Sequence, residues 1–173
     1  ELKADRDGTI KELKEMGYEG VELINDFGMS AKDLKNYFAD AGLEICSMHK
    51  GIPDRTEKWS EILEYAAEAG IPALITPFKE INYFFPMLRL NRTMDMFNTW
   101  ADEARKYGIQ VGYHNHQMEF IGVEGKTVME HIYDKTADDF ILEVDVCWAR
   151  YGFNDNPVKM LEKLKKKATT LCH

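Results

Sequence analysis

Histidine and carboxylate side chains are concentrated at a few points of this 173-residue sequence, where apolar segments end. Residues 112–119 read GYHNHQME, and residues 140–146 read FILEVDV. Four of the five histidines lie at or near the ends of predicted strands, whereas His131 lies on a predicted helix. Random placement would put more histidines on solvated helix faces, so this distribution indicates a site at one edge of a sheet.

The chemistry that these residue types favour is the binding of a divalent metal. Side chains two residues apart on a strand point the same way, so His114 and His116 share one face, as do Glu143 and Asp145. Imidazole and carboxylate groups from separate strands form a mixed nitrogen and oxygen donor set. Such a set suits Mn, Zn, Fe or Co better than Ca.

Each of these residues also has a purely structural interpretation. A single buried histidine on a strand is more often a hydrogen-bonded core residue than a metal ligand. The pair His114 and His116 beside Asn115 makes the two interpretations about equal. Glu22 can pair with a lysine at the rim, and Trp148 can either pack in the core or form a wall on which a sugar stacks.

The elements that must position these residues follow a repeated pattern, in which an amphipathic helix ends at a glycine and a strand follows at once. The four junction glycines are spaced by 25, 28 and 38 residues, about the size of one βαβ unit. The pattern predicts strands near 18–25, 43–49, 72–77, 109–116, 139–146 and 169–173. It predicts helices near 7–16, 30–41, 56–69, 90–107, 126–134 and 157–167.

Strands that alternate with helices predict an α/β fold with a parallel sheet and right-handed crossovers. Two architectures fit this order, an open doubly wound sheet and part of a (β/α)8 barrel. In both, chemistry collects at the C-terminal ends of the strands, where Glu22, His49, His114, Glu143 and His173 are predicted to lie. The aromatic stretch at 82–86 is expected to form a loop or lid.

Composition excludes several classes of function. With 45% hydrophobic and 30% charged residues the chain is expected to be globular, and its net charge of −8 argues against nucleic-acid binding. No apolar run approaches the length of a membrane-spanning helix, and no signal-peptide pattern is present at the start. The three widely spaced cysteines predict reduced, buried thiols in a cytoplasmic protein rather than a disulfide framework.

Three motifs resemble those of a known family. Residues 112–120 resemble the YHNHxxEF signature of the sugar phosphate isomerase/epimerase family, which are xylose isomerase-like TIM barrels of the AP endonuclease family 2 superfamily. Residues 142–149 resemble the LEVDVCWA strand of that family, and residues 17–23 resemble its GYxGVEL opening. The resemblance extends over essentially the whole chain and implies a TIM barrel with a divalent metal, Mn, Zn or Co, at the strand C-termini.

The resemblance also implies roles for individual residues. Asp145 and His173 match metal ligands of the sixth and seventh barrel strands. His114 stands where relatives often carry a ligand Glu, so it is either a metal ligand or a catalytic base. Glu119 matches an acidic residue that handles substrate hydroxyls, as a base or a contact. The remaining predicted substrate-binding residues are Glu22, His49, His116 and Trp148.

The ends of the chain depart from the family pattern. Relatives have a strand ahead of the helix predicted near residue 7, and they continue beyond His173 to a closing Glu on strand eight. We therefore expect 1–173 to form one xylose isomerase-like domain, incomplete at both ends, with about strands 2–7 of the barrel. Two uncovered sheet edges would favour self-association.

The function predicted from these features is a metal-dependent isomerase or epimerase of a sugar or sugar phosphate. The metal would chelate a carbonyl and a neighbouring hydroxyl and stabilise an enediolate, while a carboxylate or imidazole moves the proton. Two alternatives stay open. One is a keto-sugar lyase or dehydratase that uses the same metal site, and the other is a non-catalytic sugar-binding or partner subunit. The charge of −8 argues against endonuclease activity.

Overall fold

The computed structural model describes residues 5–51, 58–153, 156–165 and 171–173. Its centre is a five-stranded parallel sheet with the strand order β1-β2-β3-β4-β7. The strands are β1 (Gly20–Leu23), β2 (Glu44–His49), β3 (Ala73–Thr76), β4 (Gln110–His114) and β7 (Ile141–Glu143). The five complete predicted strands are therefore confirmed, and all of them pair in the predicted parallel direction.

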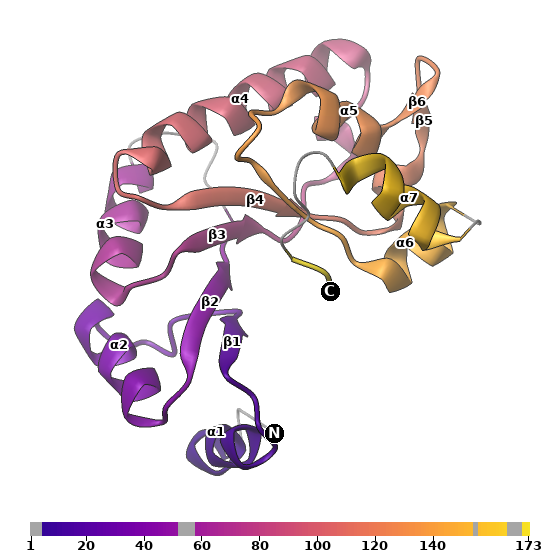
Figure 1. Ribbon diagram of the computed structural model, residues 1–173. Coiled ribbons are helices and arrows are strands. Elements are labelled where there is room, and N and C mark those ends of the chain that lie inside the picture. The colour runs from indigo at the N-terminus through magenta and orange to yellow at the C-terminus, as the bar shows by residue number, and fades with distance from the viewer. Residues whose placement is uncertain (1–4, 52–57, 154–155, 166–170) are drawn as a thin grey trace.

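Helices connect successive strands and form an outer layer around the sheet (Figure 1). They are α1 (Arg6–Glu15), α2 (Ala31–Asp40), α3 (Trp59–Ala69), α4 (Met87–Arg105), α5 (Val128–Lys135), α6 (Val146–Phe153) and α7 (Pro157–Leu164). A short antiparallel pair, β5 (Gly122–Val123) and β6 (Lys126–Thr127), precedes α5. Two 3-10 turns, η2 (Ile81–Tyr83) and η3 (Gln117–Phe120), follow β3 and β4.

Local signals in the sequence account for the ends of these helices. Gly70 ends α3 with a φ of 73°, the left-handed conformation that glycine adopts without steric cost, and the other three junction glycines also have positive φ. Thr127 and Glu130 form a capping box at the start of α5. Asn156 caps α7, whose first residue is Pro157 as predicted.

The sixth predicted strand is present as a single parallel bridge between Val144 and Cys172, and residues 169–170 of that prediction lie outside the described residues. Backbone hydrogen bonds from Val146 to His173 and from His173 to Val144 extend this pairing. The pairing places His173 directly beside the segment that follows β7. The first two residues of predicted helix 56–69 and the last two of predicted helix 157–167 also lie outside the described residues.

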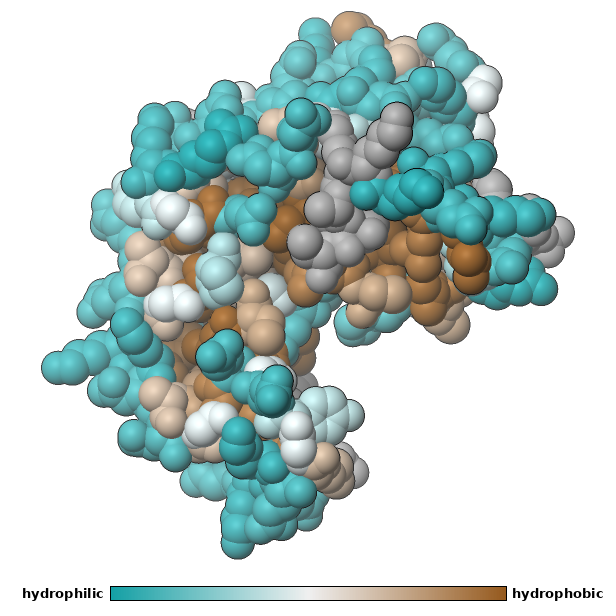
Figure 2. All heavy atoms as spheres, viewed as in Figure 1, coloured by the Kyte–Doolittle hydropathy of each residue, from teal (hydrophilic) through white to brown (hydrophobic). Residues whose placement is uncertain are grey.

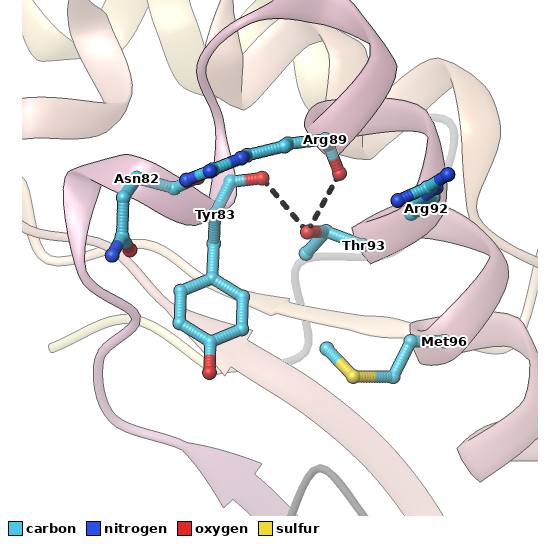
Figure 3. A pocket seen from close by; sticks show the side chains of 6 residues that line it. All are labelled: Asn82, Tyr83, Arg89, Arg92, Thr93 and Met96. Carbon is cyan, nitrogen blue, oxygen red and sulfur yellow. Dashed lines mark hydrogen bonds between the residues drawn. The ribbon is translucent and has the colours of Figure 1, made fainter.

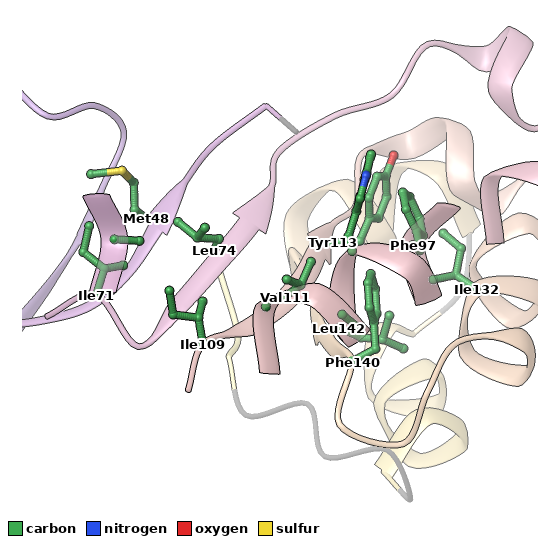
Figure 4. Packing of buried hydrophobic residues seen from close by; sticks show 14 of the residues in the cluster. Met48, Ile71, Leu74, Phe97, Ile109, Val111, Tyr113, Ile132, Phe140 and Leu142 are labelled. Atoms are coloured by element: carbon green, nitrogen blue, oxygen red, sulfur yellow. The ribbon is translucent and has the colours of Figure 1, made fainter. Parts of the chain in front are cut away.

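The main hydrophobic core lies between the sheet and the outer helices. Leu74, Val111, Tyr113 and Leu142 project from three neighbouring strands toward this layer (Figure 4). Phe97 of α4 stacks on Phe140 with ring centroids 5.3 Å apart. This packing fixes the sheet against α4 and α5, and alternate residues of the strands, among them His114, project from the opposite face.

A second, smaller apolar layer covers the opposite face of the sheet. It consists of Ala73, Ile75 and Ile141, with Leu171 packed against it. Gly112 lies in this layer, and a Cβ atom there would come within 2.7 Å of both the Ile141 Cβ and the Ile75 Cδ1. A side chain at residue 112 would therefore displace the layer that supports His114 two residues later.

Three predictions from the sequence need correction. The predicted strand 139–146 ends at Glu143, and helix α6 begins at Val146 because the Asp145 side chain caps its first turn. Of the two forms predicted for 82–86, a loop is present between η2 and α4, but it is anchored in the core rather than a lid, since Phe84 is fully buried and contacts Tyr113 edge to face. The expectation of buried cysteines is wrong, because Cys46, Cys147 and Cys172 are free but exposed.

Figure 2 shows hydrophobic side chains gathered in the middle of this view, between hydrophilic rims, with the outline hollowed between the α1–β1 end and the α6–α7 end. None of the described helices combines the length and the apolar character that crossing a membrane requires.

The close contacts of Gly112 yield a stability prediction. Gly112→Ala should lower the free energy of unfolding by about 1–3 kcal/mol, because the new Cβ overpacks the inner layer. Gly122→Ala is the matched control, since nothing lies within 4 Å of a Cβ built there. Urea denaturation measures both variants. Equal stability of the Gly112→Ala variant and the wild type would contradict this account of the inner layer.

Candidate metal centre

Polar side chains from four strands meet at the C-terminal edge of the sheet. Glu22, His49, His114 and Glu143 lie at or next to the last residues of β1, β2, β4 and β7. His114 and Glu143 are direct partners in the register of β4 and β7. The sequence placed these residues at one edge of the sheet, where they lie in the structure, and the register of β4 and β7 brings His114 and Glu143 into contact.

Glu143 is the centre of this cluster. Its Oε2 lies 2.7 Å from His114 Nδ1 and 2.8 Å from His49 Nε2, and the residue is 2% exposed. His49 Nε2 also lies 3.0 Å from Glu22 Oε1, and the Ser47 hydroxyl donates to the other oxygen of Glu22. One buried carboxylate thus receives two imidazole nitrogens, and a second carboxylate supports the outer imidazole.

The charges of the cluster follow from these contacts. Burial works against ionisation of Glu143, but hydrogen bonds from His114 and His49 outweigh it and hold its pKa well below the usual range. Burial also works against a charge on His49, yet its contacts with Glu143 and Glu22 raise its pKa to about 9. At neutral pH the cluster therefore contains a Glu143 carboxylate and a His49 imidazolium.

The Glu143 carboxylate determines which nitrogen of His114 carries the proton. An ionised carboxylate only accepts hydrogen bonds, so His114 Nδ1 must be the donor in the 2.7 Å contact. In the neutral ring the lone pair is then on Nε2, which points toward Asp145. Carboxylate–histidine pairs of this kind orient metal-binding histidines in proteins.

Three donor atoms lie on the side of His114 that faces away from Glu143, at spacings that fit a metal ion. They are His114 Nε2, Asp145 Oδ2 and His173 Nδ1. Asp145 Oδ2 lies 3.8 Å from His114 Nε2 and 3.3 Å from His173 Nδ1. Ligands bound tetrahedrally at about 2.1 Å lie roughly 3.4 Å apart, so these donors fit a single ion. Among the described residues, His49, His114 and Glu143 form a second such group, but their spacings of 2.7–2.8 Å are those of hydrogen bonds.

Asp145 is held in place by its neighbours. Its backbone N–H donates to Asn115 Oδ1 at 3.0 Å, and Asn115 Nδ2 donates back to its carbonyl oxygen at 3.2 Å. Asp145 Oδ1 accepts the N–H of Trp148 in the first turn of α6. Oδ2 is therefore the oxygen left to face His114 and His173.

Glu119 makes its hydrogen bonds to residues outside this cluster. It is fully buried, and its two oxygens accept hydrogen bonds from the Tyr113 hydroxyl at 2.6 Å and the His116 backbone N–H at 2.8 Å. The Tyr113 hydroxyl also accepts the N–H of Lys79 in the loop after β3. Burial, followed by the charge of Glu119, raises the Tyr113 pKa well above its usual value. Glu119 thus fixes the backbone of η3 and of His116.

His116 and Trp148 lie side by side at the rim, with ring centroids 5.4 Å apart. His116 also contacts the ring of His114, its neighbour but one along the chain. Burial, and then the proximity of His114, lower the pKa of His116, so its imidazole is neutral at physiological pH. These two of the four predicted substrate-binding residues therefore border the metal-spaced donors.

A sequence profile of the xylose isomerase-like TIM barrel family matches residues 10–171. The chain belongs to this family. The resemblance seen in the motifs is thereby confirmed, and the sheet is identified as part of a TIM barrel.

Several solved structures share this fold. A sugar phosphate isomerase/epimerase from Parabacteroides distasonis has a TM-score of 0.75 at 24% identity, over 96% of this chain and 68% of its own. A zinc-bound IolI protein has a TM-score of 0.69 at 16% identity, over 96% and 66%. A probable 3-DHS dehydratase, AsbF from Bacillus anthracis, has a TM-score of 0.68 at 13% identity, over 93% and 64%.

Sequence identities of 13–24% show only that these proteins share the fold of this chain. The chain spans about two thirds of the length of each of these three proteins. A comparison with curated proteins gave no match. The chemistry of this family member therefore depends on its own side chains.

Sequence reasoning missed the central position of Glu143, although it placed Glu143 on the same face as Asp145. The residue was not among the predicted site residues, because its contact with His114 depends on the register between β4 and β7. The signal that points to it is the i, i+2 pair of carboxylates in the LEVD segment. Asn115 and Ser47, which hold Asp145 and Glu22, had no comparable signal.

A separate pocket of about 360 Å³ lies along α4, lined by Asn82, Tyr83, Arg89, Arg92, Thr93 and Met96. Figure 3 shows the Arg89 guanidinium extended toward Asn82 and the Arg92 guanidinium apart from it, on the other side of Thr93, so the two groups do not converge on one anion. The Thr93 hydroxyl at its centre bonds the carbonyl oxygens of Tyr83 and Arg89. The donor cluster at the strand ends is therefore the better candidate for chemistry.

The raised pKa of His49 predicts how stability depends on pH. A group whose pKa is higher in the folded state stabilises the fold below its unfolded pKa, here about 6.5, and this stabilisation is lost as pH rises through the folded value. In chelator-treated protein the free energy of unfolding should fall by about 1–3 kcal/mol between pH 6.5 and about 9.

His49→Gln should remove this part of the pH dependence, as urea denaturation at a series of pH values would show. Groups that titrate equally in both proteins cancel in the difference between the two curves. Parallel curves for the wild type and the variant would mean that His49 carries no extra proton in the folded state.

Proposed function

We propose that this family member is a metal-dependent isomerase or epimerase that transfers a proton on a carbon next to the carbonyl of a sugar or sugar phosphate. The observation that supports this most directly is the convergence of His114 Nε2, Asp145 Oδ2 and His173 Nδ1 at metal-ligand spacing. The family of the chain and its barrel fold support the same class of reaction.

His114, Asp145 and His173 would hold the metal, and the mixed nitrogen and oxygen donors suit Mn, Zn or Co. A divalent ion in this position supplies Lewis-acid stabilisation of negative charge on the oxygens of a sugar carbonyl and its neighbouring hydroxyl. Glu143 would act on His114 alone, by keeping the proton on Nδ1 and the lone pair on Nε2.

His49 and Glu22 are the members of the cluster that a substrate can reach most easily. Their side chains are 13% and 21% exposed, against 3% for Glu143. The Nε2–H of protonated His49 is directed to Glu143 and Glu22, so Nδ1–H is the donor that it can offer to a carbonyl or hydroxyl oxygen of the sugar. Glu22 can accept a hydroxyl proton, and its hydrogen bonds to Ser47 and His49 keep its carboxylate in one orientation.

The two residues predicted to be catalytic take different parts in this proposal. His114 was predicted as a ligand or a base, and its hydrogen bond to Glu143 favours the ligand role. Glu119 was predicted as a base or a substrate contact. Because both of its oxygens are occupied and it is fully buried, we assign it as a positioning residue for His116 and η3.

The same geometry favours one second function, a keto-sugar lyase or dehydratase. Elimination needs an acid that protonates the departing hydroxyl, and the protonated His49 beside Glu22 has the chemistry for that step. The products separate the two functions, because elimination creates an unsaturated product and isomerisation does not.

Metal binding is the first test. Asp145→Ala should lower the affinity for Zn²⁺ or Mn²⁺ by at least about 100-fold, and Glu143→Gln by about 10–100-fold because His114 loses its orienting partner. Isothermal titration calorimetry measures both. Asp138→Ala, at an exposed aspartate in the segment before β7, is the matched control and should bind as the wild type does. Full affinity in the Asp145→Ala variant would remove that residue from the ligand set.

Proton transfer is tested separately, with the metal-loaded protein in D2O and a panel of ketoses, aldoses and their phosphates. An isomerase or epimerase should incorporate deuterium at the carbon next to the carbonyl, as mass spectrometry shows. An unsaturated product would select the lyase. Sugar binding with neither exchange nor elimination would contradict the enzyme proposal and favour a non-catalytic binding subunit.

A further inference from the structure

The turns that lead from helices α1, α2, α3 and α4 into the next strand repeat one structure. In each turn a glycine has positive φ, and the residue after it donates its N–H to a carbonyl oxygen in the last turn of the helix. That residue is Tyr18, Leu43, Ile71 or Ile109. The three aliphatic side chains are 1–3% exposed and pack in the core, whereas Tyr18 is 55% exposed. Tyr18 therefore departs from a pattern that the fold otherwise repeats.

Met16 lies two positions before Tyr18 and is 70% exposed. Two exposed carboxylates, Glu15 and Glu19, flank this apolar pair in the sequence. The backbone N–H groups of the turn donate to carbonyl oxygens of α1 at 2.9–3.1 Å, so its conformation is fixed before any partner binds. Fixed backbone lowers the entropic cost of binding. We call residues 15–19 the acidic knob.

A groove of about 570 Å³ lies at the same edge of the sheet, between the ends of α2 and α3 and the strands that follow them. Its lining includes Phe38, Leu43 and Ala69, which are buried in the core, so the groove has an apolar floor. Its volume is within the range of pockets that hold small ligands. The groove is therefore large enough to receive side chains from another molecule.

The acidic knob and the groove are neighbours, because all strands of the parallel sheet begin at this edge (Figure 1). The N–H of Glu44, which lines the groove, donates to the carbonyl oxygen of Glu19 in the knob at 2.9 Å. Lys14, just before the knob, donates from Nζ to the carbonyl oxygen of Gly42 in the groove at 2.7 Å. A projection beside a hollow on one face allows two copies to pair about a twofold axis, since each copy fills the groove of the other.

The charges of the two features are complementary. Lys35 lines the groove and Lys14 borders it, against the single carboxylate of Glu44, whereas the knob carries Glu15 and Glu19. Within the described part of the chain, Lys35 and Glu19 make no ion pair. A groove with net positive charge therefore faces a knob with net negative charge when two copies meet.

We propose that this N-terminal face of the sheet is the interface of a symmetric dimer, in which the acidic knob of each copy occupies the groove of the other. Met16 and Tyr18 cover the apolar floor, and Glu19 of one copy pairs with Lys35 of the second. The candidate metal centre stays open in both copies, because it lies at the opposite ends of the strands. This inference goes beyond the proposed function and does not depend on it.

Sedimentation equilibrium of the 173-residue chain in EDTA tests the interface, since the chelator prevents association through shared metal ions. The wild type should form a dimer that saturates with concentration. Tyr18→Ser should raise the Kd of the dimer at least about tenfold, the effect of losing a tyrosine at the centre of an interface. Ile24→Ser is the matched control, because Ile24 is 68% exposed and follows the other end of β1. It should dimerise as the wild type does.

Charge reversal tests the twofold symmetry of the contact. Lys35→Glu and Glu19→Lys should each weaken their own homodimer by about fivefold, because like charges then meet at both symmetric positions. A mixture of the two variants should dimerise as well as the wild type does. In the mixed dimer the introduced glutamate faces the introduced lysine at one position, and the native pair forms at the other.

The proposal is overturned if the wild type is a monomer at every concentration, if Tyr18→Ser dimerises as the wild type does, or if the mixed charge variants associate no better than each alone. Loss of the dimer in Ile24→Ser alone would also overturn it and would assign association to the open edge at β1. Growth into species larger than a dimer would contradict a closed twofold contact. Metal binding is not used in any of these measurements, so the proposed function is tested separately.

Discussion

The arrangement of the candidate site depends on one buried carboxylate that receives two imidazole nitrogens. Glu143 lies 2.7 Å from His114 and 2.8 Å from His49, and it stays ionised because these contacts outweigh its burial. Removing either imidazole would leave charge poorly compensated inside the sheet, which is costly in a protein interior. The same carboxylate affects the two imidazoles in different ways. It keeps the lone pair of His114 on Nε2, toward Asp145 and His173, and it keeps the His49 ring protonated beside the more exposed Glu22.

Packing on both faces of the sheet holds Glu143 and the two imidazoles in position. The helix-facing core, with Tyr113 and Phe97, holds the strands in register, and the register makes Glu143 the partner of His114. The inner layer of Ala73, Ile75 and Ile141 lies below the cluster and leaves room only for a glycine at position 112. The segment after β7 then adds Asp145, and its pairing with the C-terminal residues brings His173 to the same point.

Much of this could be predicted from the sequence, since the spacing of glycines and apolar segments reflects local physics. Strands, helices and their parallel order followed from that pattern, and so did the gathering of His49, His114 and Glu143 at one edge. The bonding within the cluster could not be predicted. Glu143 and His114 are 29 residues apart, and only the register of two strands decides that they touch. Glu119 looked like a reactive acid, yet a 3-10 turn and the Tyr113 hydroxyl occupy both of its oxygens. Helix α6 was missed because its start depends on a single capping side chain, Asp145.

The central claim, that Glu143 fixes the protonation of His114, can be measured directly by the nitrogen chemical shifts of the histidine rings. Two-dimensional ¹H–¹⁵N correlation spectra of the metal-free protein distinguish the two neutral tautomers, and a His114→Gln variant assigns the signals. The account predicts that His114 carries its proton on Nδ1 in the wild type and that Glu143→Gln disturbs this preference. A His114 ring protonated on Nε2 in the wild type, with Nδ1 as the acceptor, would contradict it.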